Sequence, residues 1–439
     1  MKMLPLLFLL TLTTTLSAQW NPGEVYREFI WVTPEGGEAF LRVGGRYGYQ
    51  QTPGKFPDSL QRGDQLLLPA VTDLGDAVRA ELVLEKVMSH EDSRDLRVEV
   101  NGHAPLTFPE PATIPEPQTE YMYHTDVRVE VPLGQLSAVQ RNELRFTLDT
   151  TQRWGWPQNL LYAITLRVYY AASTTPASQT FAAPVRQAQG PPATAPPSVV
   201  SGADYLGEVV YLIAQTAFAT QHVDYIMVGE DTDWSGRGVT NRKHWQTHRG
   251  KPLKTIGRSA DTGDHFTVRW DTRWVPDQSN FGLQCRALGP DGKYRVSEVL
   301  TNQNFAARPY RVALYAPEPA PRNWVTRSGE FSQVINVPDA VDDVLELQLN
   351  WVSWSPCYSN GLFLNGHLLW DRTDDCYVYA THSPVFTGHD TETLLRGENK
   401  IHTALTPLFR GKMVHGMEVQ WPGVQLKVRR RIAGYRLRE

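Results

Sequence analysis

The sequence predicts an all-β protein built from three antiparallel β-sandwich domains, and three observations favour this fold. Apolar and polar residues alternate with a period of two in many short segments, such as 96–100, 127–131, 164–168 and 424–428. No segment has a long helical period, and turn-forming residues such as those at 290–292 separate the alternating segments. Strands with one dry and one wet face are typical of antiparallel sheets packed as sandwiches.

A short apolar run follows a positive charge at the start of the chain. Lys2 precedes the apolar residues of 4–12, and Leu16-Ser17-Ala18 fits a cleavage site. We therefore expect residues 1–18 to be a signal peptide and the protein to be secreted, either extracellular or periplasmic. The run is too short to span a bilayer, and no other stretch approaches the required length.

Length and composition indicate several domains and exclude one class of partner. The chain has 439 residues and a formal net charge of -4, without a basic block large enough to favour a nucleic-acid partner. Residues rich in Ala, Thr, Ser, Gln and Pro interrupt the alternation once at length. We expect a sandwich at 19–172, a linker at 173–202, sandwiches at 203–316 and 318–430, and a basic tail at 431–439.

An internal repeat relates the first and third predicted domains. Asn101-Gly102-His103 follows a strand in the first, and Asn365-Gly366-His367 follows one in the third. Each is followed later by a second asparagine that opens a strand, Asn142 and Asn399. Two copies of one sandwich plan explain this order and spacing most simply.

This strand–NG–GEN–strand pattern resembles the galactose-binding-like jelly-roll domains that accompany many secreted glycan-degrading enzymes. The resemblance covers the first and third domains, where it implies that the asparagines serve the fold rather than a ligand. The first copy departs from it, with Gln140-Arg141-Asn142 in place of Gly-Glu-Asn. The middle domain resembles an immunoglobulin-like or fibronectin-like sandwich, and the whole chain matches no family of known activity.

Three cysteines suit an oxidising compartment. Cys357 and Cys376 lie close in sequence, and we expect them to form a disulfide. Cys285 lies in an alternating segment and is interpreted as a small buried side chain, not as a nucleophile.

Loop aromatics are the first candidates for a ligand site. Trp154 and Trp156 lie in a Gly- and Pro-containing loop with Gln158 after them, and flat indole rings can stack on sugar rings. The alternative is that they cap the end of the sandwich. Trp351 continues the apolar side of its strand, so we assign it to the core.

The segment from His415 to Trp421 is a second candidate for ligand binding. His415 and Glu418 fall on opposite faces of an alternating strand, so an acid–base pair would need a bulge at Gly416. Polar support of a loop is the alternative for His415, Glu418 and Trp421. No metal-ligand spacing of the HxH or HExxH type occurs near them.

Asp231 and Asp233 begin a segment like a calcium loop, but Arg242 stands where the bidentate glutamate belongs. A polar hairpin tip is the alternative. We expect no cofactor other than a structural Ca²⁺ here. Farther on, Asp271 and Asp277 fit either a catalytic carboxylate pair or turn hydrogen bonding, and we favour the turn.

We therefore expect a secreted, non-catalytic protein whose partner is a polysaccharide or other glycan. A secreted glycoside hydrolase or polysaccharide lyase is one alternative, for which two unpaired carboxylates in a cleft would be needed. A structural or assembly protein of the cell surface, with a cell-surface partner, is the other, and long uncovered edge strands would favour it.

Overall fold

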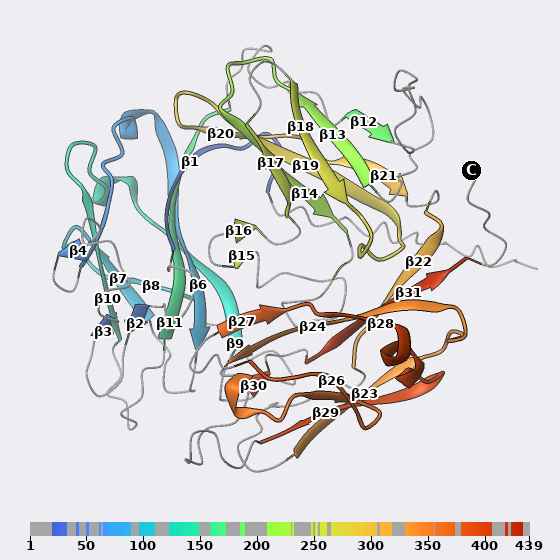
Figure 1. Cartoon of the computed structure of the whole chain (residues 1–439). Helices are drawn as coiled ribbons and strands as arrows, with labels where there is room; N and C mark the ends of the chain where they lie inside the picture. The colour runs from blue at the N-terminus through green and yellow to red at the C-terminus, as the bar shows by residue number, and fades with distance from the viewer. Residues whose placement is uncertain are drawn as a thin grey trace, which may run out of the picture.

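The computed structural model confirms an all-β chain of antiparallel sheets packed as sandwiches (Figure 1). Every strand pairing among the described residues is antiparallel, from the first strand to the last. The structure describes residues 20–32, 41–43, 50–51, 61–62, 65–88, 96–109, 123–148, 159–172, 185–188, 209–229, 231, 247–248, 251–252, 255–260, 265–304, 308–317, 330–354, 356–373, 379–405, 418–419 and 423–432. The predicted signal peptide and most of the predicted linker and basic tail lie outside these residues.

The N-terminal sandwich packs two sheets face to face. One contains β1 (Val25–Val32), β2 (Leu41–Val43), β3 (Gln50–Gln51), β6 (Ala77–Met88), β9 (Tyr123–Glu130) and β11 (Asn159–Tyr170). The other contains β4 (Gln61–Arg62), β5 (Gln65–Leu68), β7 (Leu96–Val100), β8 (Leu106–Thr107) and β10 (Asn142–Leu148). Two short 3-10 turns, η2 (Leu74–Asp76) and η4 (Leu133–Gln135), lie in the connections.

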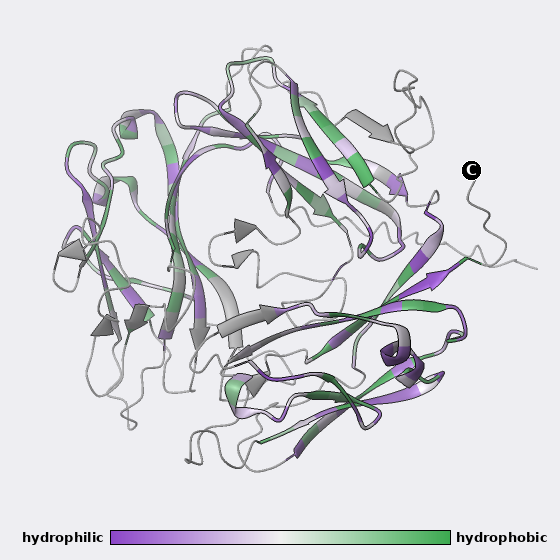
Figure 2. Ribbon diagram, in the orientation of Figure 1, coloured by the Kyte–Doolittle hydropathy of each residue, from purple (hydrophilic) through white to green (hydrophobic). Residues whose placement is uncertain are grey.

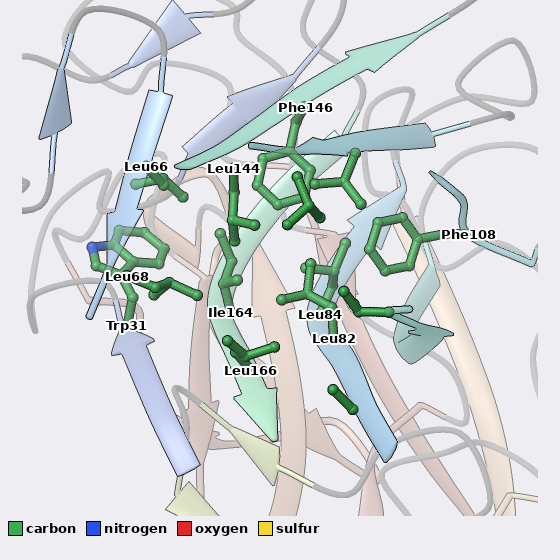
Figure 3. Packing of buried hydrophobic residues seen from close by; sticks show 14 of the residues in the cluster. Trp31, Leu66, Leu68, Leu82, Leu84, Phe108, Leu144, Phe146, Ile164 and Leu166 are labelled. Atoms are coloured by element: carbon green, nitrogen blue, oxygen red, sulfur yellow. The ribbon is translucent and has the colours of Figure 1, made fainter. Parts of the chain in front are cut away.

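The alternation read from the sequence builds the core of this sandwich. Leu96, Val98 and Val100 of β7 are fully buried, and the charged residues between them are not. They belong to one cluster of buried side chains with Leu82 and Leu84 from β6 of the facing sheet. Figure 3 shows Leu82 and Leu84 among other members of this cluster. Hydropathy colouring shows the same alternation along the strands (Figure 2).

The middle region contains a second core. β12 (Val185–Ala188), β13 (Val209–Gln215) and β18 (His265–Asp271) form one sheet. The strands of the other sheet are β14 (His222–Val228), β17 (Thr255–Ser259), β19 (Ser279–Leu288), β20 (Tyr294–Val296) and β21 (Leu300–Asn304), and a small hairpin pairs β15 (Thr247–His248) with β16 (Lys251–Pro252). Strand β12 falls inside the segment expected as a linker, and it pairs with β13.

A single sheet crosses from the N-terminal sandwich into the middle region, which the sequence analysis did not anticipate. Strand β20 pairs with β1, with Tyr294 opposite Tyr26, so the strand order runs β17-β14-β19-β20-β1-β11. A junction core lies where they meet, and its buried members are Trp20, Tyr26, Tyr169, Ile226, Val228, Tyr294 and Val296. The two regions are therefore joined by backbone hydrogen bonds and by a shared apolar cluster.

The C-terminal sandwich also has two sheets. One contains β22 (Tyr310–Tyr315), β24 (Val344–Trp354), β27 (Tyr379–His382), β28 (Val385–Thr387), β30 (Glu418–Val419) and β31 (Gln425–Arg431). The other has the order β23 (Glu330–Val337), β29 (Gly397–Ala404), β25 (Leu362–Leu364) and β26 (His367–Trp370), and the 3-10 segments are η7 (Pro356–Tyr358) and η8 (Gly388–Thr393). Just before β22, Arg308 holds the start of this sandwich against the middle region by donating to the carbonyls of Thr272 (2.7 Å) and Val275 (2.8 Å).

The repeated asparagines make the same hydrogen bonds in both outer sandwiches. Asn101 Nδ2 donates to Asn142 Oδ1 at 2.9 Å, and Asn365 Nδ2 donates to Asn399 Oδ1 at 2.9 Å. Each first asparagine also accepts a backbone N–H from the residue after the second one, at 2.7 and 2.8 Å. Both turn asparagines have positive φ, 50° and 52°, and a glycine follows each. These side chains close a turn against a strand, so they serve the fold, as the sequence resemblance implied.

Candidate functional site

A row of alternating charges crosses the shared sheet on the face opposite the N-terminal core. We call it the charged ladder, and its members in spatial order are Arg258, Asp224, Arg286, Glu28, Arg167 and Glu81. Strand pairing aligns them, since Glu28 lies opposite Arg167, Arg167 opposite Glu81, and Asp224 opposite both Arg286 and Arg258. The ladder therefore runs across strands of the middle region and of the N-terminal sandwich.

The centre of the ladder is buried and closely bonded. Arg286 is held between Glu28 (2.8 Å) and Asp224 (3.1 Å), and its side chain is only 4% exposed. Arg167 contacts Glu28 at 2.6 Å. Aromatic rings complete the surroundings, because the Arg286 guanidinium lies 4.0 Å from the Tyr294 ring centroid, close enough for a cation–π contact.

The electrostatics of the ladder do not suit acid–base catalysis. Burial alone would raise the pKa of Glu28, but Arg286 and Arg167 more than offset it and hold that pKa below its ordinary value. Burial raises the pKa of Tyr169 to about 12, while its hydroxyl donates to Glu81 at 2.5 Å. A catalytic acid needs a raised carboxyl pKa, so we interpret the ladder as the element that fixes the two regions together.

On the opposite face of the shared sheet, a second set of polar contacts joins the N-terminal sandwich to the middle region. Asp73 accepts from Arg27 (2.9 Å), Tyr170 (2.5 Å) and Lys293 (3.1 Å), and Lys293 belongs to the turn between β19 and β20. Arg27 also donates to the carbonyl of Asp291 in that turn, at 2.7 Å. The turn predicted at 290–292 is formed, and its contacts with Arg27 and Asp73 dock it on the N-terminal sandwich.

A cluster of aromatic rings gathers at one end of the C-terminal sandwich, and we call it the aromatic end. It comprises the rings of Trp351, Trp370 and His382, together with Ser353, which contacts His382. Trp351 of β24 stacks on His382 of β27, directly opposite in the strand pairing, with centroids 4.5 Å apart and an interplanar angle of 19°. Trp370 reaches across from the other sheet and meets Trp351 edge-on at 5.0 Å.

The members of the aromatic end differ in exposure. Trp351 is only 1% exposed, which confirms its assignment to the core, whereas Trp370 and His382 are half-buried. Ser353 Oγ lies 2.9 Å from His382 Nε2 but is itself fully buried. Because a buried hydroxyl cannot reach a substrate, this pair orients the imidazole and does not form a nucleophile with its base. Trp370 and His382 are thus the members of the aromatic end that are partly exposed.

The sequence-predicted site residues are only partly placed by the structure. Trp154, Trp156, Gln158, His415, Trp421 and Asp233 lie outside the described residues. For Glu418 the structure gives the backbone, in β30, where it pairs with Trp354 of β24. Of the predicted segment, the structure thus describes only Glu418 and Val419, on a strand that pairs with the end of β24. Asp231 forms an ion pair with Lys427 at 2.5 Å, so it bonds to the C-terminal sandwich.

Other predicted candidates are explained by local bonding. Asp271 accepts the backbone N–H of Arg273 at 3.0 Å, the Asx-type turn that the sequence favoured, and binds the Arg273 guanidinium. Asp277 forms an ion pair with Arg308. Among the described residues there is no group of three or more His, Cys, Asp or Glu side chains that could hold a metal ion.

The cysteines divide into a bonded and a free set. Cys285 is a free, fully buried thiol whose pKa burial raises to about 12, which confirms the interpretation that it is not a nucleophile. Cys357 of η7 is disulfide-bonded. Cys376 lies outside the described residues, so its pairing with Cys357 stays a prediction.

The aromatic end was missed by sequence reasoning as a unit. Trp351 was assigned to the core, but its contacts with Trp370 and His382 depend on which strands pair. The alternating segment 345–351 was the available signal for Trp351. Nothing local marks the His382 side chain as its stacking partner.

Comparison with known proteins gives only distant structural likenesses. No known family matches the chain, and no curated protein does. Solved structures with similarity include a β-porphyranase of glycoside hydrolase family 86 from Bacteroides plebeius, which is 8% identical, with 52% of this chain and 35% of that one covered and a TM-score of 0.22. Another is the glycoside hydrolase domain of Endo-D from Streptococcus pneumoniae R6 (10% identical, 55% and 31% covered, TM-score 0.24).

The ANX1 ectodomain from Arabidopsis thaliana matches over more of the chain, with 92% of this chain and 96% of that one covered, at 8% identity and a TM-score of 0.20. The chain spans about a third of the length of the glycoside hydrolases. At these TM-scores the likenesses assign neither a family nor an activity. Among the described residues no helix is long and apolar enough to cross a membrane.

Proposed function

We propose that this chain is a secreted, non-catalytic carbohydrate-binding protein whose outer sandwiches are galactose-binding-like jelly rolls and whose middle region is immunoglobulin-like. The aromatic end is the observation that carries the proposal. A half-buried Trp370 beside a half-buried His382 offers one flat apolar face and one polar ring, the combination that suits a sugar with its C–H face and hydroxyls. Glu418 belongs to β30, which pairs with β24, the strand that carries Trp351, and the predicted ligand residue Trp421 follows it in the sequence.

The bonding of the ladder carboxylates, Asp271 and Asp277 favours binding over catalysis. A glycosidase needs two carboxyl groups free to exchange protons or attack the sugar. The ladder carboxylates are each bonded by arginines, and Asp271 and Asp277 are bonded likewise. A hydrolase or lyase would have to use other acidic residues.

The test is binding to a panel of soluble polysaccharides, measured by affinity electrophoresis and calorimetry with xyloglucan, galactomannan and polygalacturonate. Trp370→Ala should weaken binding by about tenfold or more, since loss of about 1.4 kcal/mol of ring stacking corresponds to that factor. His382→Gln should weaken it less, because the amide keeps a polar group near Ser353.

The matched control is Leu395→Ala. Leu395 is 51% exposed and lies near the Asn365 turn, at the other end of the same sandwich. Circular dichroism of all variants should match the wild type. If no polysaccharide binds, or if Trp370→Ala and Trp154→Ala both bind with unchanged affinity, the proposal is wrong.

A further inference from the structure

Strand β23 forms one edge of its sheet, and its outward backbone groups are not used by other described residues. The order β23-β29-β25-β26 leaves β23 paired only with β29, along all eight residues and without a bulge. Lys400 of β29 directs both its N–H and its C=O to Asn365, so its partner Val334 directs its own backbone groups away from β29. Ser332 and Asn336, two residues away on either side, do the same.

This edge lacks the features that usually protect a sheet edge. Residues 331–337 contain no charge, no glycine and no proline, and exposed Ser332, Val334 and Asn336 alternate with buried Gln333, Ile335 and Val337. Natural edge strands are usually short, bulged or charged. A long, neutral and regular edge is a template for another strand.

Several other described edge strands carry such protection. Strand β9 has the same length as β23 but carries Asp126, Arg128 and Glu130. Strand β17 has a bulge beside Gly257 and an exposed Arg258. Strands β4, β8, β26 and β27 have four residues or fewer. The difference points to a use for β23 rather than to a general property of these sandwiches.

We propose that β23 pairs with β23 of a second copy of this chain, antiparallel and about a two-fold axis through Val334, so that two C-terminal sandwiches share one continuous sheet. In this register Val334 faces Val334, Ser332 faces Asn336, and Gln333 faces Ile335. Glu330, the only charged residue of the strand, faces Pro338 rather than the partner's glutamate. The edge is therefore self-complementary in pattern and free of like-charge repulsion.

The first experiment measures the mass of the full-length protein by sedimentation velocity between about 1 and about 100 μM. The wild type should be a dimer that dissociates on dilution. Val334→Pro removes only an outward N–H, so it should leave the pairing with β29 intact and raise the dimer dissociation constant at least about tenfold. Val334→Lys should do the same by placing two ammonium groups opposite each other.

Val139→Lys is the control, because it adds the same charge at a position 89% exposed in the N-terminal sandwich and should leave the dimer unchanged. A wild type that is monomeric over the whole range overturns the proposal. A folded Val334→Lys variant that dimerises as well as the wild type also overturns it, because the interface would then lie elsewhere.

A second measurement does not depend on proline being tolerated. In the proposed register the two Val334 Cα atoms are about 5.5 Å apart, which suits a disulfide. Val334→Cys should therefore give a covalent dimer under mild oxidation. Val139→Cys, at a position 89% exposed in the N-terminal sandwich, sets the level of random crosslinking. Equal yields from the two variants would contradict the proposed pairing.

Discussion

Replacing Arg286 with methionine tests whether the charged ladder joins the N-terminal sandwich to the middle region. The substitution keeps much of the apolar stem but removes the cation between Glu28 and Asp224. Breaking a buried ion pair by removing one partner costs about 3–5 kcal/mol. In the variant, Glu28 keeps its ion pair with Arg167 and Asp224 keeps its ion pair with Arg258. We therefore expect the free energy of unfolding to fall by about 3 kcal/mol, the lower end of that range.

The assay is guanidinium unfolding followed by tryptophan fluorescence, since Trp20 lies in the junction core beside Arg286. The wild type should unfold the joined regions in one transition, and Arg286→Met should shift its midpoint downward. Arg269→Met, an exposed arginine on β18, is the control and should change the free energy of unfolding by less than about 0.5 kcal/mol.

A double-mutant cycle sharpens the test. If the ladder acts through the pair, Glu28→Gln together with Arg286→Met should cost less than the sum of the two single variants. A loss below about 1 kcal/mol for Arg286→Met would refute the assignment, because a solvated surface pair contributes no more than that.

Two further predictions concern the turns and the junction. Asn101→Ala and Asn365→Ala should each destabilise the protein by about 2–4 kcal/mol, because alanine resists positive φ and leaves the paired asparagine without its partner. Glycine at either position should lower the stability measured by thermal unfolding by less than alanine does. Equal losses for glycine and alanine would contradict the role of φ. Burial lowers the pKa of His222, so its neutral form is favoured in the fold; that stability is present above about pH 6.5 and is lost as pH falls below it. His222→Phe should flatten the dependence of the urea midpoint on pH between 7 and 5, and an unchanged slope would argue against this account.

Local patterns were enough to predict much of the fold. In strands such as 96–100, the alternation of apolar and polar residues predicts which face is buried. Asn-Gly pairs predict turns with positive φ. Both signals lie within a few residues, so a single sequence carries them. The resemblance implied that the repeated asparagines serve the fold, but their bonds join residues 41 and 34 positions apart, and no local pattern predicts them.

The shared sheet could not be read in this way. Arg167 and Glu81 alternate with apolar residues, as residues on a solvated face do, and this alternation predicts that their face is wet. It is buried because β20, more than a hundred residues later, pairs with β1 and brings Arg286 against Glu28. No local pattern reports such a pairing, and the same holds for His382 under Trp351.

The position of Trp20 limits how this chain can be divided. Its side chain is 3% exposed, its carbonyl accepts from Gln284, and its ring lies under the Arg286 guanidinium. A fragment that began at the middle region would lack this indole and the Tyr26 ring, and Arg286 would lose Glu28 and keep only Asp224. Tyr294 and the apolar residues Ile226 and Val228 of β14 would then face water. The smallest autonomous piece containing the middle sandwich should therefore begin at or before Trp20, although that residue lies far upstream in the chain.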